Sequence, residues 1–247
     1  MIELLNILAL IGTVLLGGLI VIWVDSYKQK GLIKIMLAFS GGFLLAIAFN
    51  HFLPELYAAN QHYIGLYIIV GFLLQLLLEY FSGGIEHGHV HVEHGKSMPW
   101  MLFISLSVHS FIEGIPLAIP DTHEVIHHAH EHHSHLSGQS LLLGILFHQT
   151  PVAIALMTLL RASSFSARKA WFILSLFALM TPLGLIFGYF TQGSLGNLNM
   201  DILLAIVVGM FLHISTTIIF EASENHRFNL AKLASILIGV FLALLIQ

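Results

Sequence analysis

The sequence contains no cysteine, and only 9% of its 247 residues are charged. The absence of cysteine excludes disulfide bonds and thiolate metal sites. Soluble domains carry about 25% charged residues, so this low charge, together with 57% hydrophobic residues, excludes an ordinary soluble domain. Only nine lysines and arginines are present and they are dispersed, which argues against nucleic acid as a partner. The composition is typical of a protein that crosses a lipid bilayer several times.

Eight apolar stretches each approach the ~20 residues that a helix needs to cross the hydrocarbon core. They lie at roughly 2–24, 32–55, 62–81, 99–119, 138–160, 169–190, 201–221 and 228–246. The connections between them are short, which leaves no room for a soluble domain. We therefore predict an all-α polytopic membrane protein in which residues 1–247 form a single transmembrane domain with eight helices.

The basic residues predict the orientation of these helices. If the eight helices alternate in direction, every basic residue falls on one side: Lys28, Lys30, Lys34, Lys96, Arg161, Arg168, Lys169, Arg227 and Lys232. Under the positive-inside rule this side is cytoplasmic, and both termini are extracytoplasmic. The compact chain favours the inner (cell) membrane of a bacterium.

His109 and Glu113 lie four residues apart within an apolar stretch long enough to span the membrane. Four residues is about one helical turn, so the imidazole and the carboxylate share a face. A carboxylate at bilayer depth costs about 2.5–3.5 kcal/mol on insertion scales, and a divalent transition metal bound by both groups would offset that cost. The alternative is a neutral core histidine hydrogen-bonded to the neighbouring glutamate.

Other ionisable groups lie in other spans. His148 precedes Pro151 and could supply a third metal ligand or a gating contact. The remaining candidates for an ion pathway are His51, Glu55, Gln149, His213 and Glu221. For the two glutamates, ordinary solvation at the membrane interface is the alternative interpretation.

Two polar segments are rich in histidine, a composition typical of loose metal binding. The cytoplasmic loop, residues 82–98, contains His87, His89, His91 and His94. The extracytoplasmic loop, residues 120–137, contains His123, His127, His128, His130, His132, His133 and His135. We interpret both as metal-capture segments, with solvated loops that bind no ligand as the alternative.

Residues 123–127 read HEVIH, the spacing of a zinc-protease helix. At this density of histidine the match is expected by chance, and no clear third ligand stands out. Metal affinity on both sides of a membrane fits a cation pathway, and a protein that only conducts the metal would not need Glu124, which a protease would use as general base. We therefore predict that Glu124→Ala leaves zinc transport unchanged, whereas Glu113→Ala removes it, as measured by uptake of radioactive zinc.

The spans at 32–55 and 201–221 share a pattern although they run in opposite directions. In one, residues 42–45 read GFLL and lead to His51 and Glu55. In the other, residues 209–212 read GMFL and lead to His213 and Glu221. Opposed repeats of this kind are a feature of many secondary transporters, whose substrate sites lie near the midplane.

Four motifs in this order resemble the ZIP family (zinc- and iron-regulated transporter-like proteins). Residues 109–114 read HSFIEG, close to the family's H-[SN]-x-x-E-G helix. Residues 53–55 (LPE), 148–151 (HQTP) and 181–184 (TPLG) are similar to its L-P-E/D, H/Q-x-x-P and T/S-P-L-G elements. The resemblance covers the whole chain, and the HSFIEG motif is its most specific part.

The resemblance implies a 3+2+3 bundle in which inverted three-helix repeats enclose the fourth and fifth helices. It implies that His109, Glu113 and His148 hold the ion. Members with two adjacent metal sites have a second carboxylate where this chain has Val152, and other positions near the site carry Gln149 and Ser110. The departures imply one tightly held ion.

The function that follows is transport of a divalent transition-metal ion, by import toward the cytoplasm and alternating access. Zn²⁺ is the expected substrate, with Fe²⁺, Mn²⁺, Co²⁺ and Cd²⁺ as alternatives. No prosthetic group and no catalysed reaction are expected. The partners are the metal ion and the lipid bilayer, with a homodimer as one option for the assembly. A membrane-bound metal sensor or storage protein, and the protease, are the competing functions.

Overall fold

The computed structural model describes residues 2–23, 26–58, 63–82, 100–118, 134–163, 165–194, 200–221 and 230–246. These residues form helices and short turns, with no strand among them, and so confirm the all-helical class. The elements are α1 (Ile2–Trp23), α2 (Ser26–Ile47), the π-helix η1 (Ala48–Phe52), α3 (Leu53–Ala58), α4 (Ile64–Ser82), α5 (Trp100–Gly114), the 3-10 helix η3 (Ile115–Ala118), α6 (Ser134–Ala162), α7 (Ala167–Ala178), α8 (Met180–Ser194), α9 (Met200–Glu221) and α10 (Leu230–Leu245).

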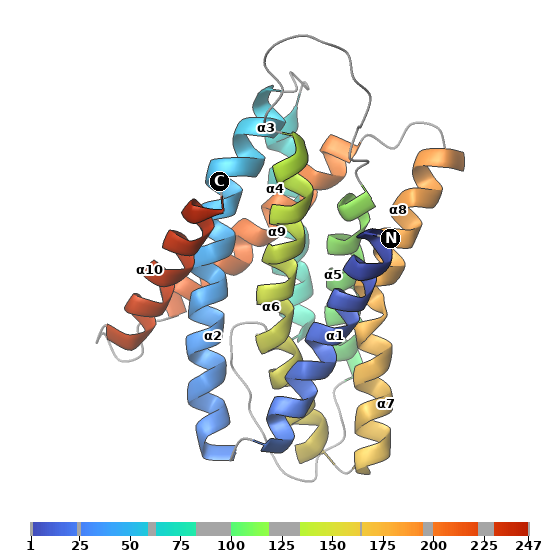
Figure 1. Ribbon diagram of the computed structural model, residues 1–247, viewed down its shortest axis with the longest axis vertical. Helices are drawn as coiled ribbons and strands as arrows, with labels where there is room; N and C mark the ends of the chain where they lie inside the picture. Colours follow the sequence, from blue (N-terminus) through green and yellow to red (C-terminus); the bar gives the residue numbers. More distant parts are fainter. Residues whose placement is uncertain are drawn as a thin grey trace.

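The predicted spans agree with these helices. Within the described ranges, seven helical stretches are long and apolar enough to cross a membrane: Glu3–Trp23, Gly31–Ala58, Ile64–Phe81, Trp100–Ala118, Gly138–Ala162, Ala167–Thr191 and Met200–Phe220. The eighth predicted span corresponds to α10, which is apolar but shorter. The helices run side by side along the long axis of the bundle (Figure 1).

Local chemistry explains where the helices change geometry. Pro54 has no N–H to donate, and just before it the chain widens into η1, where the N–H of Leu53 bonds the carbonyl oxygen of Ala48. Pro182 likewise has no N–H to donate, and it lies just after the break between the end of α7 at Ala178 and the start of α8 at Met180. Ser166 caps the start of α7, because its hydroxyl accepts a hydrogen bond from the backbone N–H of Lys169.

The helix pairing has the form of an inverted repeat. Helix α2 packs along α10, and α4 packs along α9; α1 packs along α6, and α5 along α8. Suppose that the first three spans, α1, α2–α3 and α4, correspond to the last three, α7–α8, α9 and α10. The contact of α2 with α10 is then equivalent to that of α9 with α4, and the contact of α1 with α6 is equivalent to that of α8 with α5. The arrangement agrees with the predicted 3+2+3 bundle.

Glycines allow three of these pairs to touch backbone to backbone. Helices α5 and α8 do so at Gly114 and Gly184, where an added Cβ atom would lie 2.1 Å from the Thr181 oxygen and 2.0 Å from the Phe111 oxygen, respectively. A Cβ atom on Gly71 of α4 would lie 1.9 Å from the carbonyl oxygen of Ile206 in α9. A Cβ atom on Gly42 of α2 would lie 2.3 Å from the carbonyl oxygen of Ile236 in α10. Gly42 and Gly209, the glycines of the repeated sequence pattern, both lie at such contacts, because a Cβ on Gly209 would lie 2.0 Å from the Ile68 oxygen.

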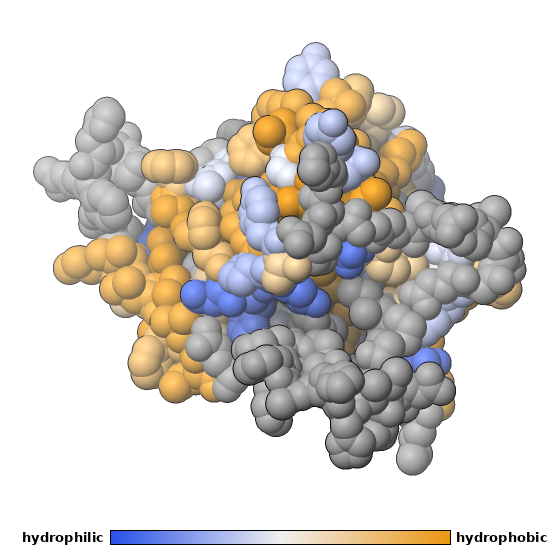
Figure 2. Space-filling view, turned by 90° about the horizontal axis from the view of Figure 1, so that it is seen from above, coloured by the Kyte–Doolittle hydropathy of each residue, from blue (hydrophilic) through white to orange (hydrophobic). Residues whose placement is uncertain are grey.

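Polarity increases toward the inside of the bundle. Large apolar side chains are exposed along the outer faces of the helices, among them Leu4, Leu73 and Phe241. Buried polar side chains lie within, including Gln75, His109, Glu113, His148 and Gln149. Figure 2 looks onto the end of the bundle where α3 lies and shows hydrophilic side chains near its middle. This distribution suits a lipid environment outside and a polar ligand inside.

Candidate metal site

The central helices bring three predicted ligands together. His109 and Glu113 project from α5, and His148 projects from α6. One potential ligand atom from each lies within 4.8 Å of the others. The exposed fractions are 2% for His109, 0% for Glu113 and 1% for His148. Among the described residues, these three form the group of histidine and acidic side chains whose ligand atoms lie close enough together to hold a metal ion.

The carboxylate of Glu113 is the most informative member of the site. Its Oε1 lies 2.6 Å from Nε2 of His109, yet neither carboxylate oxygen receives a hydrogen bond from the described residues. An uncompensated buried carboxylate is strongly disfavoured in a low-dielectric interior. A bound cation would supply the missing compensation.

The spacing suits a zinc-sized ion. Zinc binds nitrogen and oxygen ligands at about 2.0–2.2 Å, so neighbouring ligand atoms around a tetrahedral ion lie about 3.4 Å apart. Side-chain adjustments of the order of 1 Å would bring the three groups to that spacing. The rings of His109 and His148 lie 5.8 Å apart with an interplanar angle of 76°, so the two imidazoles are neighbours but not stacked.

Sequence reasoning missed a polar contact from α4. Nδ1 of His109 lies 2.7 Å from Oε1 of Gln75, which is fully buried. One turn further along the same helix, Oε2 of Glu79 lies 2.5 Å from Nε2 of His213 in α9. Gln75 and Glu79 stand four residues apart in an apolar span, so the rule that identified His109 and Glu113 would have found them.

Three of the predicted pathway residues, His51, Glu55 and His213, are not part of the cluster of His109, Glu113 and His148. His51 lies in η1 and Glu55 in the first turn of α3, both partly buried. The side-chain amide of Gln149 donates a hydrogen bond to the Thr181 hydroxyl of α8. His213 pairs with Glu79, as described above. Glu221 is the last residue of α9, and its side chain lies outside the described set.

Most of the two histidine-rich loops lies outside the described residues, and so does the HEVIH motif. The second loop ends earlier than predicted, because α6 already begins at Ser134 and its first turn includes His135. The metal-capture role of the loop histidines therefore stays a prediction.

The chain is similar to known proteins named as zinc transporters. The sequence model of the family described as "ZIP Zinc transporter" matches residues 82–247. "Zinc transporter ZIP1" of Danio rerio is 28% identical over 135 residues, which cover 51% of this chain and 40% of the relative. The protein of the same name from Takifugu rubripes is 28% identical over 133 residues, with the same coverage.

A further relative, "Protein zntD" of Dictyostelium discoideum, is 28% identical over 177 residues, or 66% of this chain and 23% of the relative. The chain thus spans less than half the length of these curated relatives. The family match covers more than half of the chain and includes His109, Glu113 and His148. On this evidence the chain belongs to the ZIP zinc transporter family.

Proposed function

We propose that this protein carries divalent transition-metal ions, with zinc as the main substrate, through the site formed by His109, Glu113 and His148. The observation that carries the proposal is the burial of these three ligand groups within 4.8 Å of one another at the centre of the bundle. Family membership favours transport over catalysis. Two imidazoles and a carboxylate are suitable ligands for zinc.

The site suits an ion that must be released again. A hydrated cation exchanges its water for protein ligands on arrival, and conduction requires binding that is favourable but reversible. Three ligands without a thiolate meet this requirement better than the closed, thiolate-rich sites that hold structural zinc. Because ligands bind metal only when deprotonated, protonation of the site would assist release.

The other polar groups suggest a path through the bundle. In this proposal the ion arrives past His51 and Glu55, is held at the site, and leaves past His213 toward the first histidine-rich loop. Access alternates between the two sides as one set of helices moves against the other. The inward direction rests on the family resemblance alone.

We also propose that the site holds a single ion. Gln149, next to His148, is neutral, and its amide is already engaged with Thr181. Val152 is buried and apolar where a second carboxylate would be needed. A second divalent ion beside the first would thus have no further negative charge to balance it.

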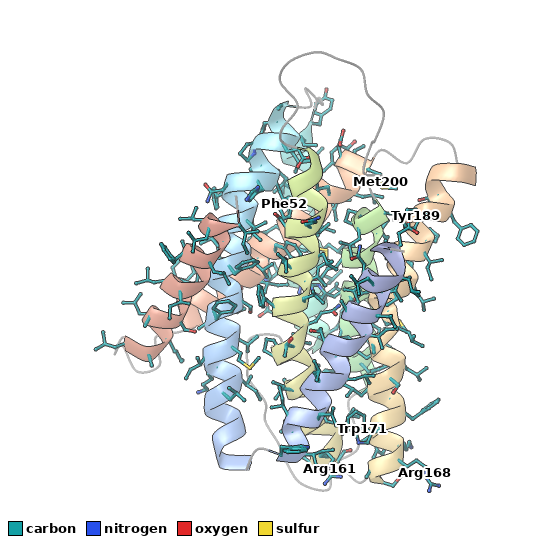
Figure 3. All side chains as sticks on the ribbon, viewed as in Figure 1. Phe52, Arg161, Arg168, Trp171, Tyr189 and Met200 are labelled. Carbon is teal, nitrogen blue, oxygen red and sulfur yellow. The ribbon has the colours of Figure 1, made fainter. Side chains whose placement is uncertain are left out.

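The proposed location is the cell membrane of a bacterium, with both termini outside. Figure 3 shows Arg161 and Arg168 at one end of the bundle, close to Trp171, and Nζ of Lys169 lies 4.1 Å from the centre of the Phe165 ring. Basic side chains are typical of the cytoplasmic side, whereas aromatic side chains are typical of either membrane interface. The N- and C-termini lie in the other half of the bundle (Figure 1). The assembly stays open, with a homodimer as one option.

The experiment that tests the proposal is uptake of radioactive zinc into proteoliposomes that contain the purified protein. We expect uptake that saturates with zinc concentration and exceeds that of protein-free liposomes. Excess Fe²⁺, Mn²⁺, Co²⁺ and Cd²⁺ added in separate samples will show which ions compete. Uptake that rises linearly without saturation would contradict the carrier mechanism, and zinc binding without any uptake would favour a sensor or storage protein.

A further inference from the structure

Gln75 is a fully buried amide on the apolar helix α4, and its side chain reaches the metal site on another helix. Its neighbours along α4 are leucines, at positions 73, 74, 76, 77 and 78. Burying an amide without hydrogen bonds costs about 1–3 kcal/mol in proteins, so a polar group here needs a partner. That partner is His109 of α5, whose Nδ1 lies 2.7 Å from Oε1 of Gln75.

This contact determines which nitrogen of His109 carries the proton. A carbonyl oxygen can only accept, so Nδ1 must donate its N–H to Oε1 of Gln75. In the neutral imidazole Nε2 then carries the lone pair. Nε2 is the atom that faces Oε1 of Glu113 at 2.6 Å. Two electron-rich atoms this close are stabilised by a cation that both can bind.

We infer that Gln75 is a positioning residue for the ion: it holds His109 in the tautomer whose Nε2 lone pair is directed at the metal. The inference rests on the proposed function and extends it to a residue that never touches the ion. Hydrogen bonds of this kind orient ligating histidines and raise their basicity, and their loss typically lowers metal affinity by about 10- to 100-fold.

The same contact connects ion binding to the surrounding helices. Helix α4 touches α9 through backbone at Gly71 and Gly209, so Gln75 belongs to the α4–α9 pair, whereas His109 belongs to the central helix α5. A movement that separates α4 from α5 withdraws the acceptor from Nδ1. His109 then loses its fixed tautomer, and the site binds the ion less tightly.

The test is the zinc dissociation constant of the purified protein, measured by competition with a fluorescent chelator. Gln75→Met keeps the length of the side chain but removes the acceptor, and we expect the dissociation constant to rise about 10- to 100-fold. Gln75→Glu restores an acceptor oxygen, and we expect affinity close to or above that of the wild type. An unchanged constant in Gln75→Met would overturn the inference.

Double variants separate positioning from a general structural effect. Gln75→Met should weaken zinc binding in a His148→Ala background but add nothing in a His109→Ala background, because Gln75 acts through His109. Equal weakening in both backgrounds would overturn the inference in favour of a packing role. If His109→Ala alone binds zinc as the wild type does, the proposed site fails, which is a different result from the failure of Gln75.

Nitrogen NMR of labelled histidine supplies a readout that packing does not move. In the zinc-loaded wild type, Nε2 of His109 should give the signal of a metal-bound nitrogen and Nδ1 that of a protonated nitrogen. In zinc-loaded Gln75→Met, a share of the His109 rings should bind zinc through Nδ1 instead, which exchanges the two signals. A protonated Nε2 in the wild type would contradict the inference directly.

Discussion

Replacement of Glu113 by glutamine is expected to abolish saturable zinc uptake at micromolar zinc. The variant keeps the volume of the side chain and removes the negative charge that faces Nε2 of His109. Loss of one partner from a buried pair of opposite charges, here the carboxylate that would bind the zinc ion, costs about 3–5 kcal/mol. Because 1.4 kcal/mol corresponds to a factor of ten, we expect zinc affinity to fall by about 100- to 4,000-fold. Uptake into proteoliposomes and the zinc dissociation constant measure the two effects.

Thermal unfolding distinguishes this loss from misfolding. Without zinc, Glu113→Gln should unfold at the same temperature as the wild type or higher, because a neutral amide is easier to bury than a carboxylate. Zinc should raise the Tm of the wild type, since a ligand that binds the folded state stabilises it, but should not raise that of the variant. Glu3→Gln is the matched control, since Glu3 is exposed in the first turn of α1 and lies outside both the cluster and the proposed ion path. A variant that retains saturable uptake would remove Glu113 from the ion's path.

The second large effect is expected on stability, from Gly71→Ala. The added Cβ would lie 1.9 Å from the Ile206 oxygen and 2.6 Å from its carbonyl carbon, so α4 and α9 must move apart. Excess volume in a packed interior costs about 1–3 kcal/mol and occasionally more. We expect a fall in Tm of roughly 5–10 °C, followed by the change in intrinsic tryptophan fluorescence on heating in detergent.

Gly12→Ala is the control for this substitution. No atom lies within 4 Å of a Cβ placed on Gly12 of α1, and alanine is favoured over glycine in a helix by about 1 kcal/mol. The Tm of Gly12→Ala should therefore equal or exceed that of the wild type. Equal Tm values for the two alanine variants would show that α4 and α9 do not depend on the close approach.

Apolar length was sufficient for the spans, and the spacing of four residues was sufficient to pair His109 with Glu113, whereas His148 was left as either a third ligand or a gating contact. Long apolar runs indicate membrane helices directly, and a charged group inside such a run indicates a buried site, which is how His109 and Glu113 were identified. Gln75 and Glu79 were missed because their span was judged by length and hydropathy alone. Their own spacing of four residues was visible in the sequence, but their partners on α5 and α9 depend on helix pairing.

Helix pairing itself could not be predicted from these residues. Glycine is frequent in membrane helices, so nothing in the sequence separates Gly71, which meets the backbone of α9, from Gly12, which meets no atom within 4 Å. The sequence pattern shared by residues 42–45 and 209–212 indicated a repeat but not the partner of either helix. The partners, α10 and α4, come from the three-dimensional packing.

The backbone contacts between α4 and α9, between α2 and α10, and between α5 and α8 also determine which helices must move together. Two helices whose main chains touch have no flexible side-chain layer between them, so neither can tilt or rotate without carrying the other. Each pair therefore moves as one rigid unit. Relative displacement is left to the boundaries that side chains bridge, such as Gln75 with His109 and Gln149 with Thr181. In the proposed transport cycle, hydrogen bonds at such boundaries can break and re-form while each helix pair stays intact.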